Sequence, residues 1–411
     1  MLRRHIEPLV RAALADTPVV LVHGARQTGK TTLSRHLVEA TPGWSYLTFD
    51  DATQLAAASA DPRGFLSTLG PCTVIDEVQR VPALFPAIKA IVDMDRRPGR
   101  FLLTGSANVL LVPRLSESLA GRIELVTLWP LSQGELSGRV ERFIDAAFAP
   151  NVSASLVADR AGPPLATRIL GGGFPEPLER TDPARRAAWF TSYLSTTLQR
   201  DIRDLANIEG WADLPRLLAL LASRTSGLLN FSDLSRGLSM PLTTLKRYLA
   251  LLEATFMVVT IPAWSSNAGL RLTKSPKLMV ADTGLACQLL GMDEARLARD
   301  GTARGALLEN FVAMELMKQA TWSATRVRLF HMRTPAGKEV DLVLEDAAGR
   351  IVGIEVKSAA TVNADDFKGL RALREMAGAK FIRGIVLHDG DTTVPFEPNL
   401  VAMPLATLWV A

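Results

Sequence analysis

The fold of this chain is decided near its N-terminus by the stretch Val19-Val20-Leu21-Val22-His23-Gly24-Ala25-Arg26-Gln27-Thr28-Gly29-Lys30-Thr31-Thr32. An apolar run precedes a GxxxxGKT loop and a helical pattern follows it, which is the order strand, phosphate-binding loop, helix. In such a loop the backbone N–H groups face phosphate oxygens, Lys30 reaches the β- and γ-phosphates, and Thr31 offers a hydroxyl to Mg²⁺. The sequence therefore predicts a site for ATP formed by Gly24, Ala25, Arg26, Gln27, Thr28, Gly29, Lys30, Thr31 and Thr32.

A second apolar strand ends in two acids, Asp76 and Glu77. Asp76 is expected to hold Mg²⁺, largely through water, and Glu77 to orient or deprotonate the attacking water. The alternative for Glu77 is a solvated residue at the end of a strand. An acidic pair that closes a buried strand is unfavourable without a cation or a role, which favours hydrolysis of the nucleotide.

Polar residues further along the chain are candidates for contacting the γ-phosphate. Thr104 or Ser106, at the polar end of an apolar run, would sense it from the neighbouring strand, unless Gly105 and Ser106 form only a turn. Arg114 and Arg122 precede another apolar strand, and either is a candidate arginine finger, acting in cis or from a neighbouring subunit. The alternative is a surface arginine near a turn.

Five apolar runs alternate with helical stretches, which predicts a parallel α/β sheet covered on both faces. The expected strands are Val19–Val22, Tyr46–Phe49, Thr73–Asp76, Phe101–Thr104 and Ile123–Leu128.

The motifs of this chain resemble those of the predicted AAA+ family ATPases of bacteria and archaea that carry a C-terminal domain of unknown function. The resemblance covers nearly the whole chain, through the segments GARQTGKT, IDEVQ, LLTGSAN, SLAGRIE, WPLSQGE, GGGFPEPL, GALLENFVAMEL, EVDLVL and IEVK. Family loops often read GPRQ where this chain has Gly24-Ala25-Arg26-Gln27, and alanine fits such a loop at least as easily as proline. The resemblance implies an AAA+ ATPase, and sites of that class are commonly completed by an arginine of a neighbouring copy, so a homo-oligomer is expected.

Length and composition predict a multi-domain protein without a membrane span. The chain has 411 residues, too many for one core, and no apolar run approaches the length of a membrane helix. Cys72 and Cys287 lie far apart in no metal-binding spacing, which fits a reducing cytoplasm. The net charge of +4 is mild evidence for a nucleic-acid partner, although a solvated arginine-rich surface explains it equally well.

The expected domains are residues 1–150, a phosphate-loop domain, residues 151–265, a helical region, and residues 266–411. Within the middle region, helices at Leu214–Thr225, Ser232–Leu238 and Pro241–Ala254 precede an apolar run from Phe256 to Ile261, the order of a winged helix-turn-helix. Ser232 would cap the second helix, and Thr243, Thr244, Lys246 and Arg247 on the third would face a DNA groove. The alternative is a protein-interaction or lid element, because one Lys-Arg pair is a small positive surface.

The C-terminal region has the element order αβββαβ, which resembles the core of the PD-(D/E)xK nuclease superfamily. Its expected first helix is Gly305 to Lys318. The resemblance implies that Asp341, Glu355 and Lys357, with Glu309 on the first helix, bind Mg²⁺ or Mn²⁺ and position a hydrolytic water. Because side chains alternate along a strand, Glu355 and Lys357 share one face. Related domains often keep the scaffold without turnover, so two hypotheses stay open. One is ATP use coupled to nucleic-acid binding or cleavage. The other is an ATP-controlled interaction switch with a catalytically dead scaffold.

Overall fold

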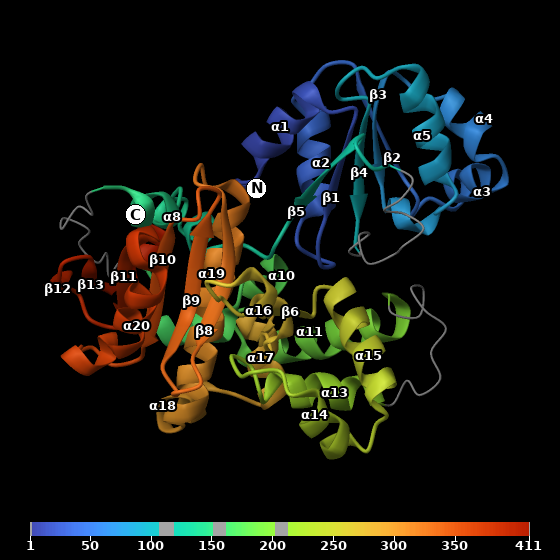
Figure 1. The fold of residues 1–411 in the computed structure, drawn as a ribbon. Helices are drawn as coiled ribbons and strands as arrows, with labels where there is room; N and C mark the ends of the chain where they lie inside the picture. Colours follow the sequence, from blue (N-terminus) through green and yellow to red (C-terminus); the bar gives the residue numbers. More distant parts are fainter. Residues whose placement is uncertain (1, 107–118, 151–161, 202–212, 411) are drawn as a thin grey trace.

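The structure is a computed structural model, and it describes residues 2–106, 119–150, 162–201 and 213–410. The described residues form a five-stranded, a six-stranded and a two-stranded sheet. The five-stranded sheet lies at one end of the molecule, above the helical middle region and the six-stranded sheet (Figure 1). Of the helices in these ranges, none is long and apolar enough to cross a bilayer.

The N-terminal sheet is parallel and has the order β2-β3-β4-β1-β5. Its strands are β1 (Val19–His23), β2 (Trp44–Thr48), β3 (Cys72–Asp76), β4 (Phe101–Gly105) and β5 (Ile123–Thr127). The expected parallel α/β sheet is therefore confirmed, with β2 beginning two residues before the expected position. Because β1 lies between β4 and β5, the loop that follows it lies next to the end of β4, and the end of β3 is one strand further away.

Helices cover both faces of this sheet because alternate residues of β1 enter two different cores. Val19 and Leu21 pack in the core that contains Phe85, whereas Val20 and Val22 pack in the core that contains Leu33. The elements of this part are α1 (Glu7–Asp16), α2 (Lys30–Glu39), α3 (Ala52–Ala60), α4 (Pro62–Ser67), the 3₁₀ turn η1 (Val78–Arg80) and α5 (Leu84–Met94).

The middle region is mainly helical. Its elements are α7 (Gln133–Ser137), α8 (Phe143–Phe148), α9 (Leu165–Gly171), α10 (Pro175–Leu178), α11 (Pro183–Thr196), the π turn η3 (Thr197–Asp201), α13 (Asp213–Ala222), α14 (Phe231–Leu238), α15 (Leu242–Ala254), β6 (Val258–Ile261), α16 (Ala268–Thr273), β7 (Lys277–Val280), α17 (Thr283–Leu290) and α18 (Glu294–Arg299). The expected cap at Ser232 is wrong: Asn230 caps α14, and its side chain accepts a hydrogen bond from the Asp233 N–H. Strand β6 pairs antiparallel with β7, and the winged-helix assignment stays a prediction.

The C-terminal region follows the expected order αβββαβ and adds two strands. Its elements are α19 (Gly301–Trp322), β8 (Val327–Arg333), β9 (Glu339–Asp346), β10 (Ile351–Lys357), the 3₁₀ turn η4 (Ala364–Phe367), α20 (Lys368–Ala377), the 3₁₀ turn η5 (Gly378–Lys380), β11 (Phe381–His388), β12 (Val394–Glu397), β13 (Leu400–Pro404) and α21 (Thr407–Val410). The sheet order is β12-β13-β11-β10-β9-β8, with β10 and β11 parallel. This order alone does not establish a nuclease fold, which stays a prediction.

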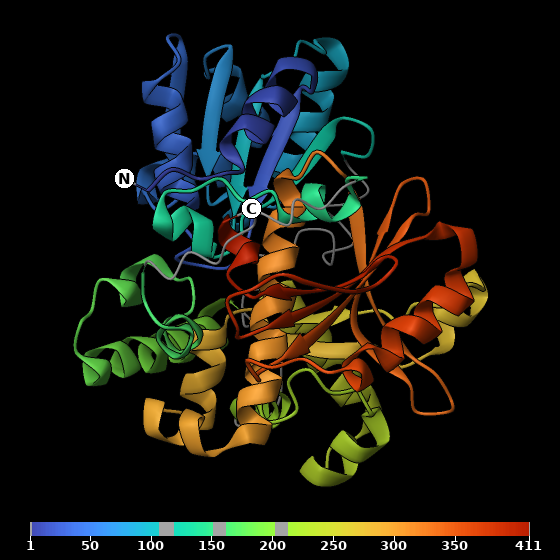
Figure 2. The ribbon, with the colours of Figure 1, turned by 90° about the vertical axis from the view of Figure 1, so that its left-hand side faces the viewer.

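Helix α19 lies between the six-stranded sheet and the helices of the middle region, directly below the N-terminal sheet (Figures 1 and 2). Its residues Leu308 and Val312 share one hydrophobic core with Leu217 of α13 and Ile354 of β10. The middle and C-terminal regions therefore pack around a common core. The pair β6–β7 also joins residues on both sides of position 265, and the three expected domain limits stay a prediction.

Candidate nucleotide site and a carboxylate-lysine cluster

The GxxxxGKT loop connects the buried strand β1 to helix α2. Gly24 is needed at the start, since a Cβ there would lie 2.1 Å from the carbonyl oxygen of Leu128. Gly29, at φ 93°, adopts a left-handed conformation just before α2 begins at Lys30. The Lys30 ammonium donates to the carbonyls of Gly24, at 3.0 Å, and Ala25, at 2.7 Å. The lysine thus folds back over the loop, and its charge lies inside it.

Asp76 lies beside this loop and is held by residues from three other elements. Its Oδ2 accepts hydrogen bonds from Thr31 Oγ1, at 2.9 Å, and from Tyr46 OH, at 2.8 Å, while its Oδ1 accepts one from Thr104. The carboxylate is almost completely buried. Burial, together with the hydrogen bond to Asp76, raises the pKa of Tyr46. Thr31 and Asp76 are hard oxygen donors placed together, and they fit a Mg²⁺ ion.

Glu77 follows Asp76 in a left-handed backbone conformation, with φ 59°. Its N–H donates to Thr104 Oγ1 at 3.2 Å, and its carboxylate accepts a hydrogen bond from Gln79. Gln79 also donates to Ser106 Oγ at 2.9 Å. Strained residues of this kind concentrate at functional sites. The structure therefore brings Glu77 and Ser106 together through one glutamine.

Tyr46 and Gln79 were not among the candidates taken from the sequence. Gln79 belongs to the IDEVQ segment, so its position next to the acidic pair was a usable signal. Tyr46 carried no such signal, because its contact depends on β2 being the neighbour of β3.

Arg122 and the phosphate loop lie at opposite ends of the strands of the N-terminal sheet. It immediately precedes β5, whose Ile123 aligns with Val19 at the start of β1, whereas the loop follows the end of β1. The five residues of β1 separate the two ends of the strands by roughly 13 Å. The guanidinium pairs with Asp93 of α5 and lowers the pKa of that carboxyl. Arg114, the other candidate finger, lies outside the described residues.

A second group of charged side chains joins the middle and C-terminal regions. Lys277, from β7, lies 2.5 Å from Glu309 Oε1 on α19 and 3.3 Å from Asp341 Oδ1 on β9. The other Asp341 oxygen accepts the N–H of Val356 at 2.9 Å. Lys277 is almost fully buried and was not expected from the sequence, where its segment Ser275-Pro276-Lys277 carries no recognisable motif.

The remaining members of this group are Glu355 and Lys357, which lie side by side as the strand alternation predicts. Lys357 Nζ is 3.1 Å from Glu355 Oε1. Burial and the charge of Asp341 raise the pKa of Glu355 to about 8, and the same two causes raise that of Glu309 to about 8. Burial alone would lower the pKa of Lys277, but the charges of Glu309 and Asp341 outweigh it and keep the ammonium protonated.

As they lie, these residues do not fit a divalent ion. In the described part of the chain, there is no group of three His, Cys, Asp or Glu side chains placed to hold a metal. Instead, an ammonium group already bonds to Glu309 and Asp341, two of the acids expected around the ion. The assignment of Asp341 and Glu355 as metal ligands, and of Lys357 as their catalytic partner, stays a prediction.

Comparisons with known families divide the chain into three matched segments. Residues 16–137 match the family described as AAA domain. Residues 163–296 and 304–408 match two families described as domains of unknown function, DUF8612 and DUF4143.

Among curated proteins, the chain is similar to uncharacterised proteins of Mycobacterium tuberculosis and Mycobacterium bovis. Each is 35% identical over 408 residues, which is 98% of this chain and 83% of the relative. An uncharacterised protein of Haemophilus influenzae is 25% identical over 255 residues, 60% of this chain and 57% of that protein.

Two solved structures show weak likeness. The RuvB Holliday junction branch migration motor of Thermotoga maritima has a TM-score of 0.27 and 19% identity, covering 70% of this chain and 93% of that one. A signal transduction ATPase with numerous domains from Pyrococcus horikoshii has a TM-score of 0.19 and 12% identity, covering 76% and 45%. At such TM-scores neither structure is a guide to what the chain does.

Proposed function

This chain belongs to a family of AAA+ ATPases that it shares with the two mycobacterial proteins, and on that premise we propose that it binds ATP with Mg²⁺ and hydrolyses it. The observation that carries the proposal is the 2.9 Å hydrogen bond between Thr31 Oγ1 and Asp76 Oδ2. It joins the residue after the loop lysine to the acid at the end of β3. These two residue types are those that hold Mg²⁺ in phosphate-loop enzymes.

Each side chain has a role that follows from its position. Mg²⁺, when bound with ATP, would supply neutralisation of charge on the phosphates. Lys30 binds phosphate oxygens from inside the loop, and the backbone N–H groups at the start of α2 add a positive helix end. The carboxylate of Glu77 accepts a proton from the attacking water. The amide of Gln79 donates a hydrogen bond to this carboxylate and orients it. The same amide nitrogen also donates to Ser106 Oγ, which helps to fix the position of Gln79.

The experiment is equilibrium ATP binding and phosphate release by the purified full chain. Lys30→Ala should abolish binding, because it removes the cation in the loop. Glu77→Gln should bind ATP as the wild type does, yet hydrolyse it on the order of a hundredfold more slowly, as expected when a positioned base is lost. Glu39→Gln, at the exposed end of α2, is the matched control and should change neither quantity.

Two results would contradict this assignment. Wild-type protein that fails to bind ATP in Mg²⁺ would remove the proposed function. Turnover near the wild-type rate in Glu77→Gln would leave ATP binding intact and remove Glu77 as the catalytic base.

We further propose that the chain binds nucleic acid and that this binding is coupled to ATP hydrolysis. We also propose that the protein is cytoplasmic and forms a homo-oligomer. Supporting features are the pI of about 9.2 and the residues Thr243, Lys246 and Arg247 on α15. Thr243, Lys246 and Arg247 are exposed, although Lys246 also lies over the ring of Phe231, 5.5 Å from its centroid. Binding to DNA and RNA, with and without ATP, tests this part.

A second candidate, an ATP-controlled interaction switch, is favoured by Lys277. Its ammonium bonds to Glu309 and Asp341, which supports a C-terminal region that works as a scaffold rather than as a metal-dependent nuclease. Incubating a panel of nucleic acids with pure protein and Mg²⁺ or Mn²⁺, with and without ATP, separates the two. Cleavage that Lys357→Ala suppresses supports the nuclease, and ATP-dependent partner binding without cleavage supports the switch.

A further inference from the structure

Arg4 contacts the phosphate loop from behind, although it lies outside every motif of the nucleotide site. Its Nη1 donates to the carbonyl oxygen of Thr28 at 2.6 Å. The same guanidinium donates to the carbonyl of Trp129 at 2.7 Å and to Glu135 Oε1 at 3.0 Å. The side chain is buried, so these contacts are shielded from water. Arginine is suited to this position because its planar fork can serve three acceptors at once.

The contact with Thr28 fixes one peptide of the phosphate loop. The carbonyl of Thr28 and the N–H of Gly29 belong to the same planar trans peptide, so they point in opposite directions. A donor that holds the carbonyl on the outer side turns the Gly29 N–H toward the inner side, where phosphate would lie. Gly29 has a left-handed conformation and little intrinsic preference to keep it, so an external anchor matters there.

We propose that Arg4 is a positioning residue for the phosphate loop, which it connects to the C-terminal region. This inference rests on the proposed function, since it assigns the arginine to the same nucleotide site. Arg4 binds the loop on one side and, on the other, the segment 129–135, which we call the hub segment.

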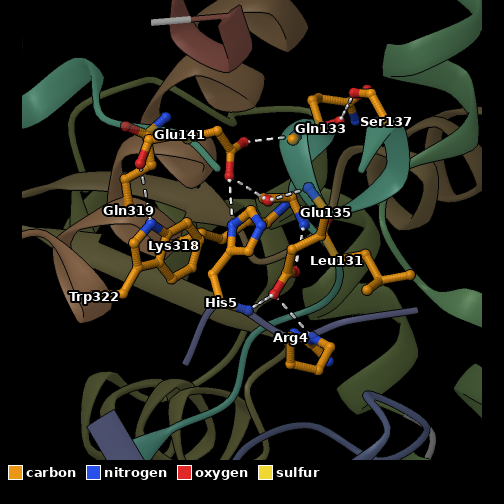
Figure 3. A network of polar contacts seen from close by, with 12 residues as sticks. Arg4, His5, Leu131, Gln133, Glu135, Ser137, Glu141, Lys318, Gln319 and Trp322 are labelled. Carbon is orange, nitrogen blue, oxygen red and sulfur yellow. Dashed lines mark hydrogen bonds and ion pairs between the residues drawn. The ribbon is translucent and has the colours of Figure 1, made fainter. Parts of the chain in front are cut away.

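The hub segment lies within a network of polar contacts (Figure 3). Ser132 and Glu135 form a capping box, in which each side chain accepts the backbone N–H of the other residue, at 3.1 and 3.0 Å. Glu141 accepts Ser132 Oγ at 2.6 Å and the N–H of Gly134 at 2.7 Å. Glu135 also accepts the N–H of His5 at 2.7 Å, next to Arg4.

Helix α19 holds the hub segment from the C-terminal side. Glu315 Oε2 accepts the N–H of Gln133 at 2.9 Å, and Lys318 donates to the carbonyl of Leu131 at 3.0 Å. Glu315 and Lys318 also pair with one another at 2.6 Å, and both are buried. A continuous set of buried hydrogen bonds therefore runs from the phosphate loop through Arg4 and the hub segment to α19.

This arrangement predicts energetic coupling between ATP binding and α19. A change at Glu315 should alter the position of the hub segment, and this should in turn move Arg4. Because Arg4 positions the phosphate loop, the affinity for ATP should then change. Coupling between two sites is reciprocal, so bound ATP should equally stabilise the contacts of α19 with the hub segment.

The first arm of the test measures ATP affinity in the full chain. Arg4→Ala should raise the Kd for ATP about tenfold, as expected for a lost hydrogen bond to a charged group. Arg4→Lys keeps the charge and one contact at a time, so its Kd should fall between those of Arg4→Ala and the wild type. Arg11→Ala is the control: it removes an exposed arginine of α1 that pairs with Glu7, and its Kd should equal that of the wild type.

The second arm measures amide hydrogen exchange of residues 25–31 without nucleotide, which needs no ATP binding. Arg4→Ala should speed exchange at Gly29 and its neighbours, while Arg11→Ala should not. This arm separates the two ideas, because wild-type protein that binds no ATP removes the proposed function without touching the exchange result. Unchanged exchange in the loop of a folded Arg4→Ala or Arg4→Lys protein would overturn the positioning role.

The third arm tests the connection to α19. Glu315→Gln should raise the Kd for ATP, and the double variant with Arg4→Ala should show less than the product of the two single changes. Effects that multiply without interaction would overturn the connection through the hub segment.

Discussion

Lys277 Nζ lies 2.5 Å from Glu309 Oε1, and both side chains are largely buried. The lysine comes from β7 of the two-stranded sheet, and the glutamate from the long helix α19. A tethered cation thus compensates part of the negative charge in the C-terminal cluster.

Replacing this lysine with an uncharged residue should make the cluster bind a cation from solution. Lys277→Met keeps the length of the side chain and removes its charge, which leaves Glu309 and Asp341 close together without a counterion. Removing one partner of a buried pair should lower stability by about 3 kcal/mol or more. In the full chain, Mg²⁺ or Mn²⁺ should then raise the Tm of Lys277→Met, and adding Asp341→Asn should abolish that increase.

Lys274→Met is the matched control, because Lys274 lies nearby and has no ion pair among the described residues. In the wild type, any metal-induced rise in Tm should persist in Asp341→Asn, since it would come from the nucleotide site. A wild-type rise that depends on Asp341 would instead support a metal site in the C-terminal region.

If Arg122 is an arginine finger, we expect it to act on a neighbouring copy, because it lies at the opposite end of the strands from its own phosphate loop. If it does so, Arg122→Ala should bind ATP normally and lose turnover. Mixing it with Lys30→Ala should restore part of the activity, because the two defects lie on opposite sides of one interface. Asp93→Ala, which removes only the partner of Arg122, should keep activity. No recovery on mixing, with a monomer by light scattering in ATP, would argue for a structural role.

Acid should destabilise the protein partly through His331. Burial and then the charge of Lys277 lower the pKa of this histidine to about 4, with smaller effects of Lys274 and Arg333. Between pH 6.5 and 4 the unfolded chain binds a proton there that the folded chain does not, so stability falls as the pH falls. At pH 5 the loss should be about 2 kcal/mol, and urea unfolding should show it much reduced in His331→Gln.

The wild-type curve alone is not sufficient, because other groups oppose this effect. Glu309 and Glu355 have raised pKa values, so they add stability as the pH falls from about 8 toward 4.5. The difference between wild type and His331→Gln isolates the histidine. Equal acid sensitivity of the two proteins would contradict its assignment as a buried neutral group.

Gly173 allows the hub segment to approach the middle region. Its carbonyl accepts the N–H of Leu131 at 2.7 Å, and a Cβ on Gly173 would lie 2.3 Å from the Leu131 carbonyl oxygen. Gly173→Ala should therefore lower the free energy of unfolding, by several kcal/mol unless the backbone shifts. Gly305→Ala, in open space on helix α19, should raise it by up to about 1 kcal/mol. Equal effects in a denaturant titration would mean that the close contact at Gly173 is relaxed easily.

The sequence by itself determined the parts of the protein that local patterns encode. The loop at Gly24–Thr31 is found from its neighbours along the chain, because a phosphate loop needs its glycines and its lysine at fixed spacing. The acids Asp76 and Glu77, at the end of β3 and just after it, are found in the same way from the apolar run before them. The carboxyl ends of parallel strands lie on the same side of a sheet, so the contact between Thr31 and Asp76 could also be expected from the sequence. The alternation of side chains likewise placed Glu355 beside Lys357.

Small choices between similar residues were decided by packing. Ser232 and Asn230 are both suitable helix caps, and the sequence does not distinguish them. In the structure α14 begins at Phe231, and Leu234 is buried in the core, which leaves Asn230 at the cap position.

Tertiary structure alone decided the contacts of Tyr46, Lys277 and Arg4. Tyr46 meets Asp76 because β2 is the neighbour of β3, and Arg4 meets Glu135 across 131 residues of sequence. Lys277 reaches Glu309 because β7 packs against α19. No local pattern encodes such pairs, since each depends on the order of strands and on which helix faces share a core. A buried lysine or arginine is recognisable only once its partners are in place.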